Sequence, residues 1–221
     1  MTDVESRLRG SFARQTMMQT LGAAMDSAAE GAVRISAPIA PYALAVVDRN
    51  SLAGIVRAHE AAKTTGVRLI VGCRLDLDEP GAPALLVYPL DRAGYGRLCR
   101  LLSLGKARAG AEGLGKTGCR LHWADLAEWG EGLLAVLLAD RPDDALAGDL
   151  ARLKSLFGDR AYCALTRRYR PNDALRLDAV AERARAARMP TLAVGDVLYH
   201  EPGRRPLHLV EPILQRLFEA A

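Results

Sequence analysis

The chain has 221 residues, and half of them are apolar, which is enough for the core of one domain or at most two. Its formal net charge is +4 and its pI is about 9.0, so the chain is mildly basic and compatible with an anionic partner. No run of about twenty apolar residues occurs, which argues against a membrane-spanning helix.

Residues 1–41 differ from the remainder of the chain. Apolar residues from Val4 to Met25 predict one loose stripe on a helix that ends near Gly31, and two prolines, Pro38 and Pro41, then interrupt regular structure. Asp3 and Glu5 precede any apolar stretch, which is unlike a secretory signal. We interpret residues 1–41 as an N-terminal helix and linker.

The stretch Tyr42–Arg74 organises the prediction for the rest. An apolar strand, Tyr42–Val47, is followed by a polar break at residues 48–51 with helix-capping side chains. Leu52, Ile55, Val56 and His59 then fall on one helical face, which predicts a packed rather than a metal-binding role for His59. Gly66 ends the helix and a second strand, Val67–Val71, follows, so the segment predicts a parallel βαβ unit.

Strands and helices continue to alternate after this unit. The spacing of apolar residues predicts four further strands, which are Ala84–Tyr88, Leu133–Leu138, Ala161–Leu165 and Thr191–Val194. It also predicts helices from 91 to 105, 124 to 129, 142 to 158 and 173 to 188. Asp91 is expected to cap the first of these helices and Gly105 to end it. This order favours an α/β fold with a largely parallel sheet, either open or closed into a barrel. The tail from Pro206 to Phe218 is amphipathic and is predicted to be helical.

One segment fits a nucleotide-binding pattern. Residues 110–117 (GAEGLGKT) match G-x-x-x-x-G-K-[ST], which cradles phosphates between a strand and a helix N-terminus. Here a predicted helix precedes the segment and an extended stretch follows it, so we interpret it as a surface loop.

Cysteines, arginines and histidines are scattered. The four cysteines, at positions 73, 99, 119 and 163, have no CxxC spacing, which favours a reduced, cytoplasmic compartment and argues against a zinc knuckle. Arginines gather at Arg167, Arg168 and Arg170 and at Arg204 and Arg205; they indicate either solvated surface or an anion- or nucleic-acid-binding patch.

Several separated blocks resemble a known family. The blocks are residues 45–59 (AVVDRNSLAGIVRAH), 69–75 (LIVGCRL), 95–106 (YGRLCRLLSLGK), 157–170 (FGDRAYCALTRRYR) and 195–207 (GDVLYHEPGRRPL). They are similar to the PHP (polymerase and histidinol phosphatase) domain of bacterial DNA polymerase III α-type enzymes, especially the error-prone, translesion branch. The resemblance covers residues 42–210 and implies a distorted (β/α)7 barrel with largely parallel strands. In this sequence the first βα unit is expected to be replaced by the N-terminal helix, and residues 211–221 are expected to form a helical tail that departs from the family pattern.

The resemblance also implies a metal centre, and this sequence departs from it. Active members carry zinc or manganese and hydrolyse phosphoesters, but their first-strand His-x-His motif is absent from residues 1–41, and their Asp-His, Glu and Asp-x-His ligands correspond to Asp48-Arg49, Arg74 and Asp196-Val197-Leu198. Arginine cannot lose its proton and repels a divalent cation. We therefore expect a vestigial pocket of Asp48, Arg49, Arg74, Asp196, Tyr199 and His200, in which Arg49 and Arg74 either pair with the two aspartates or bind an anion such as phosphate.

The sequence therefore predicts a PHP-like domain that is non-catalytic, has no cofactor and serves as a structural or partner-binding module. The expected partners are other polymerase or translesion components, and DNA, with no membrane. One alternative is a metal-dependent phosphoesterase that uses zinc or manganese with a reduced ligand set of Asp48, Asp196, His200 and His59. Another is an anion- or single-stranded-DNA-binding module. The carboxylate-bearing palm that DNA synthesis requires is not expected in this chain.

Overall fold

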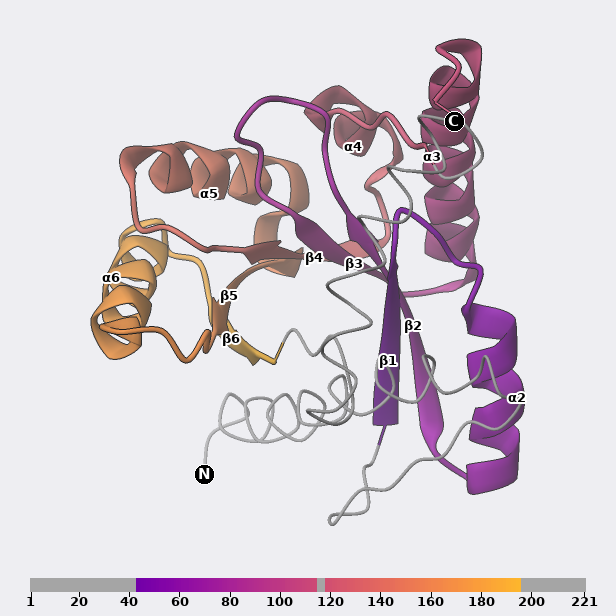
Figure 1. Ribbon diagram of the computed structural model, residues 1–221, viewed down its shortest axis with the longest axis horizontal. Coiled ribbons are helices and arrows are strands. Elements are labelled where there is room, and N and C mark those ends of the chain that lie inside the picture. Colours follow the sequence, from indigo (N-terminus) through magenta and orange to yellow (C-terminus); the bar gives the residue numbers. More distant parts are fainter. Residues whose placement is uncertain (1–42, 115–117, 196–221) are drawn as a thin grey trace, which may run out of the picture. The chain divides into compact units, whose positions relative to one another are not determined.

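The computed structural model describes residues 43–114 and 118–195 (Figure 1). The predicted N-terminal helix and linker (residues 1–41), the tail (211–221), Asp196, Tyr199, His200, Arg204 and Arg205 lie outside the described residues and stay predictions.

Six strands form one sheet in the order in which they occur in the chain. The strands are β1 (Ala43–Arg49), β2 (Arg68–Leu75), β3 (Leu85–Pro89), β4 (Leu133–Leu138), β5 (Ala161–Thr166) and β6 (Thr191–Val194). β4, β5 and β6 run parallel, with Ala135 opposite Ala161 and Cys163 opposite Thr191. β3 runs antiparallel to both β2 and β4. The α/β prediction is confirmed, and the reversal at β3 is a feature that it did not include.

The direction of β3 follows from the lengths of its connections. Only nine residues separate β2 from β3, too few for the helical crossover that a parallel neighbour requires. The predicted turn at residues 79–81 lies in this connection, where Gly81 has a φ of 78°. Helical crossovers return before β5 and β6, and those strands are parallel.

The chain divides into two compact units, and the candidate site belongs to one of them. Among the described residues, the smaller unit holds the start of β1, residues 56–69 and Gly195; the larger holds residues 47–55 and 70–194. Within the smaller unit, helix α2 (Ile55–Thr65) buries Ala58. The predicted apolar face was wrong: Leu52 precedes the helix, and Val56 and His59 are exposed.

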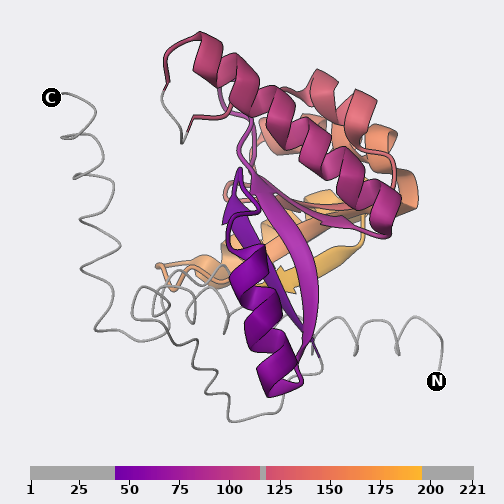
Figure 2. The same ribbon diagram turned by 90° about the vertical axis from the view of Figure 1, so that its right-hand side faces the viewer.

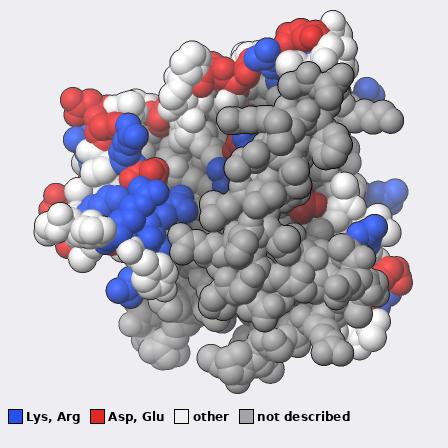
Figure 3. Space-filling view, in the orientation of Figure 1, with Lys and Arg blue, Asp and Glu red and all other residues white. Residues whose placement is uncertain are grey.

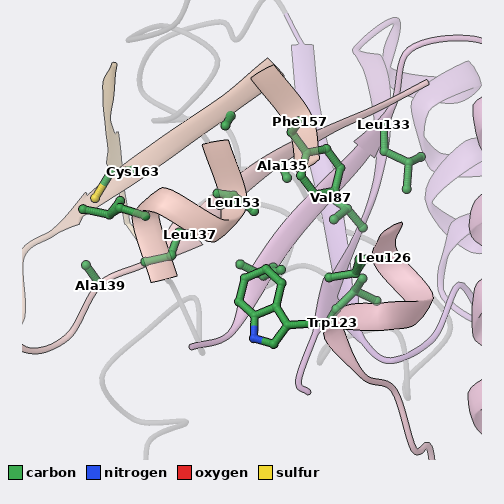
Figure 4. Packing of buried hydrophobic residues seen from close by; sticks show 14 of the residues in the cluster. Val87, Trp123, Leu126, Leu133, Ala135, Leu137, Ala139, Leu153, Phe157 and Cys163 are labelled. Carbon is green, nitrogen blue, oxygen red and sulfur yellow. The ribbon is translucent and has the colours of Figure 1, made fainter. Parts of the chain in front are cut away.

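In the larger unit, one face of the sheet is covered by four helices, which follow one another along β3 to β6 (Figures 1 and 2). They are α3 (Arg92–Ala111), α4 (Trp123–Trp129), α5 (Asp144–Phe157) and α6 (Asp173–Ala186). Alternate strand residues such as Val87, Ala135 and Cys163 point toward the helices and form one buried cluster with side chains such as Trp123 and Phe157 (Figure 4). Burial of this aliphatic layer provides the main driving force for folding of the unit.

Local capping explains two of the helix starts. The Asp91 carboxylate accepts a hydrogen bond from the Gly94 amide (2.7 Å) at the start of α3, and the Asp143 carboxylate accepts one from the Leu146 amide (3.1 Å) at the start of α5. Asp91 was predicted as a cap, whereas Pro142 was predicted to open α5. The helix begins two residues later because Asp143 supplies the cap.

Helix α3 does not end at Gly105, as predicted, but continues to Ala111. Gly105 is buried in it, and a Cβ atom at this position would lie 2.6 Å from Cys119 Sγ and 2.7 Å from Leu121 Cδ2. Its glycine therefore permits close approach of the segment 119–121 rather than a chain reversal. Gly110, which starts the nucleotide-like pattern, lies in the same helix, so the strand that a phosphate-binding loop needs before it is replaced by helix.

Candidate functional site

The carboxyl ends of β1 and β2 hold the three predicted pocket residues that lie in the described part of the chain. Asp48 and Arg49 end β1, and Arg74 is the penultimate residue of β2. The backbone amide of Asn50 donates to the Arg74 carbonyl (2.7 Å), which joins the two chain segments just beyond β1. Asn50 has a left-handed φ of 47°, a conformation that asparagine adopts more readily than most residues.

Within the described residues, Arg49 and Arg74 share the Asp76 carboxylate, while the predicted partner Asp196 lies outside these residues. Arg49 Nε forms a short ion pair with one Asp76 carboxylate oxygen, and Arg74 Nε lies 3.0 Å from the other. The Asp76 amide donates to the Asn50 side-chain oxygen (3.0 Å), which fixes the segment that follows β2. Asp76 is the site residue that sequence reasoning missed. A signal was available, because an acidic residue two positions after Arg74 in an extended segment points to the same side.

The Asp48 carboxylate is hydrogen-bonded to the backbone of the turn that follows β1. Its Oδ2 atom accepts a hydrogen bond from the Gly54 amide (2.8 Å), just before α2. The prediction that Arg49 and Arg74 pair with Asp48 was therefore wrong. The reason is local: the polar break after β1 leaves amides that need an acceptor, and the Asp48 side chain satisfies one of them.

Cys73 lies beneath these polar residues. The thiol is buried on β2, with Sγ 3.3 Å from the Asp48 carbonyl oxygen and 3.4 Å from the Ser51 carbonyl oxygen. Burial raises the pKa of the Cys73 thiol to about 12. The sulfur is therefore held as a neutral thiol at physiological pH, and a neutral thiol is neither a good nucleophile nor a good metal ligand.

The described residues at this end do not fit a divalent metal ion. Zinc and manganese sites need several histidine, carboxylate or thiolate ligands. Across residues 43–114 and 118–195, no group of three or more such side chains could hold an ion. Within these described ranges, the Asp76 carboxylate pairs with the Arg49 and Arg74 guanidiniums. Each guanidinium would oppose a cation by an energy on the order of several kcal/mol at the effective dielectric of a protein surface.

A second polar group lies at the carboxyl ends of β4 and β5. It contains the predicted arginines Arg167, Arg168 and Arg170, which follow β5, together with Asp140, which follows β4. Arg168 Nε lies 3.5 Å and Arg170 Nη1 3.8 Å from the Asp140 carboxylate. The structure thus brings these three arginines to one loop.

Of the four histidines, two lie in described segments, and neither contacts the polar residues at the carboxyl ends of β1 and β2. His59 is exposed on α2. His122 precedes α4, and its Nδ1 lies 3.7 Å from a Glu79 carboxylate oxygen, an acidic neighbour that is distant in sequence. His200 and His208 lie outside the described residues.

The class of protein follows from fold and sequence together. Residues 40–170 match the PHP domain family, and the chain belongs to that family. Its fold is similar to a candidate metal-dependent phosphoesterase from Bifidobacterium adolescentis (TM-score 0.51, 11% identity, 81% of this chain and 82% of that chain). It is also similar to an amidohydrolase from Chromobacterium violaceum solved with bound sulfate and no metal (TM-score 0.55, 15% identity, 86% and 85%).

The relatives in sequence are polymerases. The chain is 59% identical over 165 residues to Error-prone DNA polymerase 1 of Agrobacterium fabrum, a match that covers 75% of this chain and 14% of that protein. It is 43% identical over 166 residues to the Error-prone DNA polymerase of Caulobacter vibrioides, with 75% and 15% covered. The predicted resemblance to the error-prone branch is confirmed, and the chain spans about one seventh of the length of these relatives. None of the helices that the structure describes has the length and apolar character to cross a membrane.

Proposed function

We propose that this chain is a PHP domain of the error-prone polymerase type that has lost metal-dependent phosphoester hydrolysis. Its role is structural or partner-binding, within DNA replication or translesion repair, and its partners are other polymerase or translesion components. One observation carries the proposal: Arg49 and Arg74 converge on Asp76 at the carboxyl ends of β1 and β2. Enzymes on parallel α/β sheets place their chemistry at this edge.

The charges at this edge support the proposal over the phosphoesterase alternative. A catalytic metal site usually needs three protein ligands and one open position. Here Asp48 already accepts from an amide, Asp76 is neutralised by two guanidiniums, and Cys73 is a buried neutral thiol. Arginine in these places stabilises the fold by bridging the ends of neighbouring strands, which suits a brace between domains.

Hydrolysis of bis-p-nitrophenyl phosphate tests the proposal. We expect no release of nitrophenol above the protein-free rate when manganese or zinc is supplied. The same assay with Asp48→Asn and Asp196→Asn covers the two aspartates that the family resemblance retains, and Asp159→Asn, an exposed carboxylate in the turn after α5, is the matched control. Metal-dependent hydrolysis that Asp48→Asn or Asp196→Asn abolishes, and Asp159→Asn leaves intact, would contradict the proposal.

A further inference from the structure

The loop between β5 and α6 presents an aromatic ring to solvent. We call residues 167–172 the arginine–tyrosine loop. Tyr169 is 83% exposed, the most exposed large apolar side chain in the described part of the chain, and its φ is 55°. A bulky residue in the left-handed region is uncommon and carries backbone strain. The ring does not pack into the core, and its exposed face is open to contact with a ligand.

A network beneath the loop holds its backbone in place. The buried Asp173 carboxylate accepts from the Arg168 amide (2.7 Å) and the Tyr169 amide (3.0 Å). It also pairs with Arg176 (2.8 Å), and this guanidinium donates in turn to the Thr166 carbonyl and more weakly, at 3.5 Å, to the Ala139 and Asp140 carbonyls. The ends of β4 and β5 are thus tied to the loop through one ion pair. The ring is therefore presented on a fixed backbone.

The side chains around the ring are cationic. The Arg167 guanidinium lies 4.9 Å from the centre of the Tyr169 ring. Arg168 and Arg170 flank the ring in sequence and share the single carboxylate of Asp140. The side chains of Arg167 and Arg170 are exposed, and Figure 3 shows a blue patch over the β5 and α6 region.

We infer that the arginine–tyrosine loop binds single-stranded DNA, with one base stacked on Tyr169 and neighbouring phosphates held by Arg167 and Arg170. A fixed, exposed ring beside arginines is the arrangement that single-stranded nucleic-acid sites use, because every base offers a π face and every linkage a charge. A duplex hides those faces in its stack, so the exposed ring favours a single strand. This inference concerns different residues from those at the carboxyl ends of β1 and β2. It therefore does not depend on the proposal that the domain has lost phosphoester hydrolysis.

Fluorescence anisotropy with the full chain and a labelled oligothymidylate of about 16 nucleotides tests the inference. The informative variant is Tyr169→Asn, because asparagine tolerates a left-handed φ and removes the ring without straining the backbone. We expect Kd to rise roughly 5- to 150-fold, the range observed when one stacking aromatic is lost. Tyr169→Phe keeps the ring and is expected to bind within about twofold of the parent, since stacking needs no hydroxyl.

The phosphate contacts have a separate readout. Binding is expected to weaken with salt, and Arg170→Gln is expected to reduce the slope of log K against log salt by about 0.7, the value for one phosphate of a single strand. Arg100→Gln, an exposed arginine on α3, is the matched control and is expected to change neither Kd nor slope. Circular dichroism of each variant verifies that it is folded.

Three outcomes would overturn the inference. The first is no binding by the parent chain at low salt. The second is equal binding by Tyr169→Asn and the parent, because the ring would then have no role. The third is equal loss in Arg100→Gln and Arg170→Gln, because binding would then reflect overall charge rather than this loop.

Discussion

At the scale of single residues, the described part of the chain is stabilised by a few carboxylates that each satisfy several donors. Asp125 is the clearest case. It is buried in α4, and its two oxygens lie 2.5 and 2.8 Å from the Arg108 guanidinium nitrogens, while the His122 amide donates to it at 2.8 Å. The group ties the last turns of α3 to the start of α4, so its loss uncouples two helices at once.

Replacing Asp125 with alanine tests this link. The change leaves the Arg108 guanidinium without its carboxylate and the His122 amide without its acceptor. We expect the free energy of unfolding to fall by about 1.5–3 kcal/mol, the range for hydrogen bonds to a charged group. Urea denaturation measures it, with Glu128→Ala, an exposed carboxylate on the same helix, as the control. A loss below about 0.5 kcal/mol would contradict the assignment.

The same carboxylate gives a prediction about pH. Burial by itself would raise the pKa of Asp125, but hydrogen bonds from the Arg108 guanidinium and the His122 amide outweigh it and hold the pKa below its ordinary value. A carboxyl whose pKa is lowered by folding stabilises the fold fully above its unfolded pKa, about 3.9, and loses that contribution as pH falls toward the folded value. We therefore expect stability to decline below about pH 5, and the decline to be smaller in Asp125→Asn. An equal acid-induced decline in both proteins, measured as Tm against pH, would exclude Asp125 as a source.

At the scale of elements, local patterns predicted which segments are helices and strands, but not where close packing prolongs them. Leu133–Leu138 and Thr191–Val194 occur as predicted, because a short apolar run between turn residues has few other uses. Gly105 was predicted to stop α3, since glycine often follows a helix. Its actual reason is contact with Cys119 and Leu121, residues that are distant in sequence and therefore invisible to a local pattern.

A pair of glycine substitutions in α3 tests this interpretation. Gly105→Ala places a Cβ atom 2.6 Å from Cys119 Sγ and 2.7 Å from Leu121 Cδ2. We expect it to destabilise the fold by about 1–3 kcal/mol, as overpacking does, despite the better helix propensity of alanine. Gly96→Ala meets no atom within 4 Å and is expected to stabilise by up to about 1 kcal/mol. Thermal unfolding that shifts in the same direction for both variants would contradict the packing account.

At the scale of the whole molecule, the class of fold could be predicted from the sequence, but the hydrogen bonds and ion pairs of the site could not. Asp48, Arg49 and Arg74 were placed correctly at the strand ends, because parallel strands put their carboxyl ends at one edge. Their interaction partners depend on the conformation of the loops that follow the strands. The Asp48 carboxylate accepts a hydrogen bond from the Gly54 amide, and both arginines form ion pairs with Asp76. Side-chain pairing across a loop follows from three-dimensional distance, which residue spacing does not contain.

Elemental analysis of the untagged chain for zinc, manganese and iron addresses the whole molecule. We expect metal well below one equivalent after purification without chelators and after metal has been offered back, because guanidiniums replace ligands at the strand ends. Near-stoichiometric metal that survives dialysis would overturn this expectation.

The alkylation rates of the two buried cysteine thiols report how often the surrounding structure opens. Burial raises the pKa of Cys73 to about 12 and that of Cys163 to about 11, so both sulfurs are neutral thiols in the folded protein at pH 8. An alkylating reagent therefore reacts at these sulfurs chiefly when the surrounding strands separate and the ordinary thiol acidity returns. Because Cys73 lies on β2 and Cys163 on β5, their two modification rates compare how often the sheet opens near each strand.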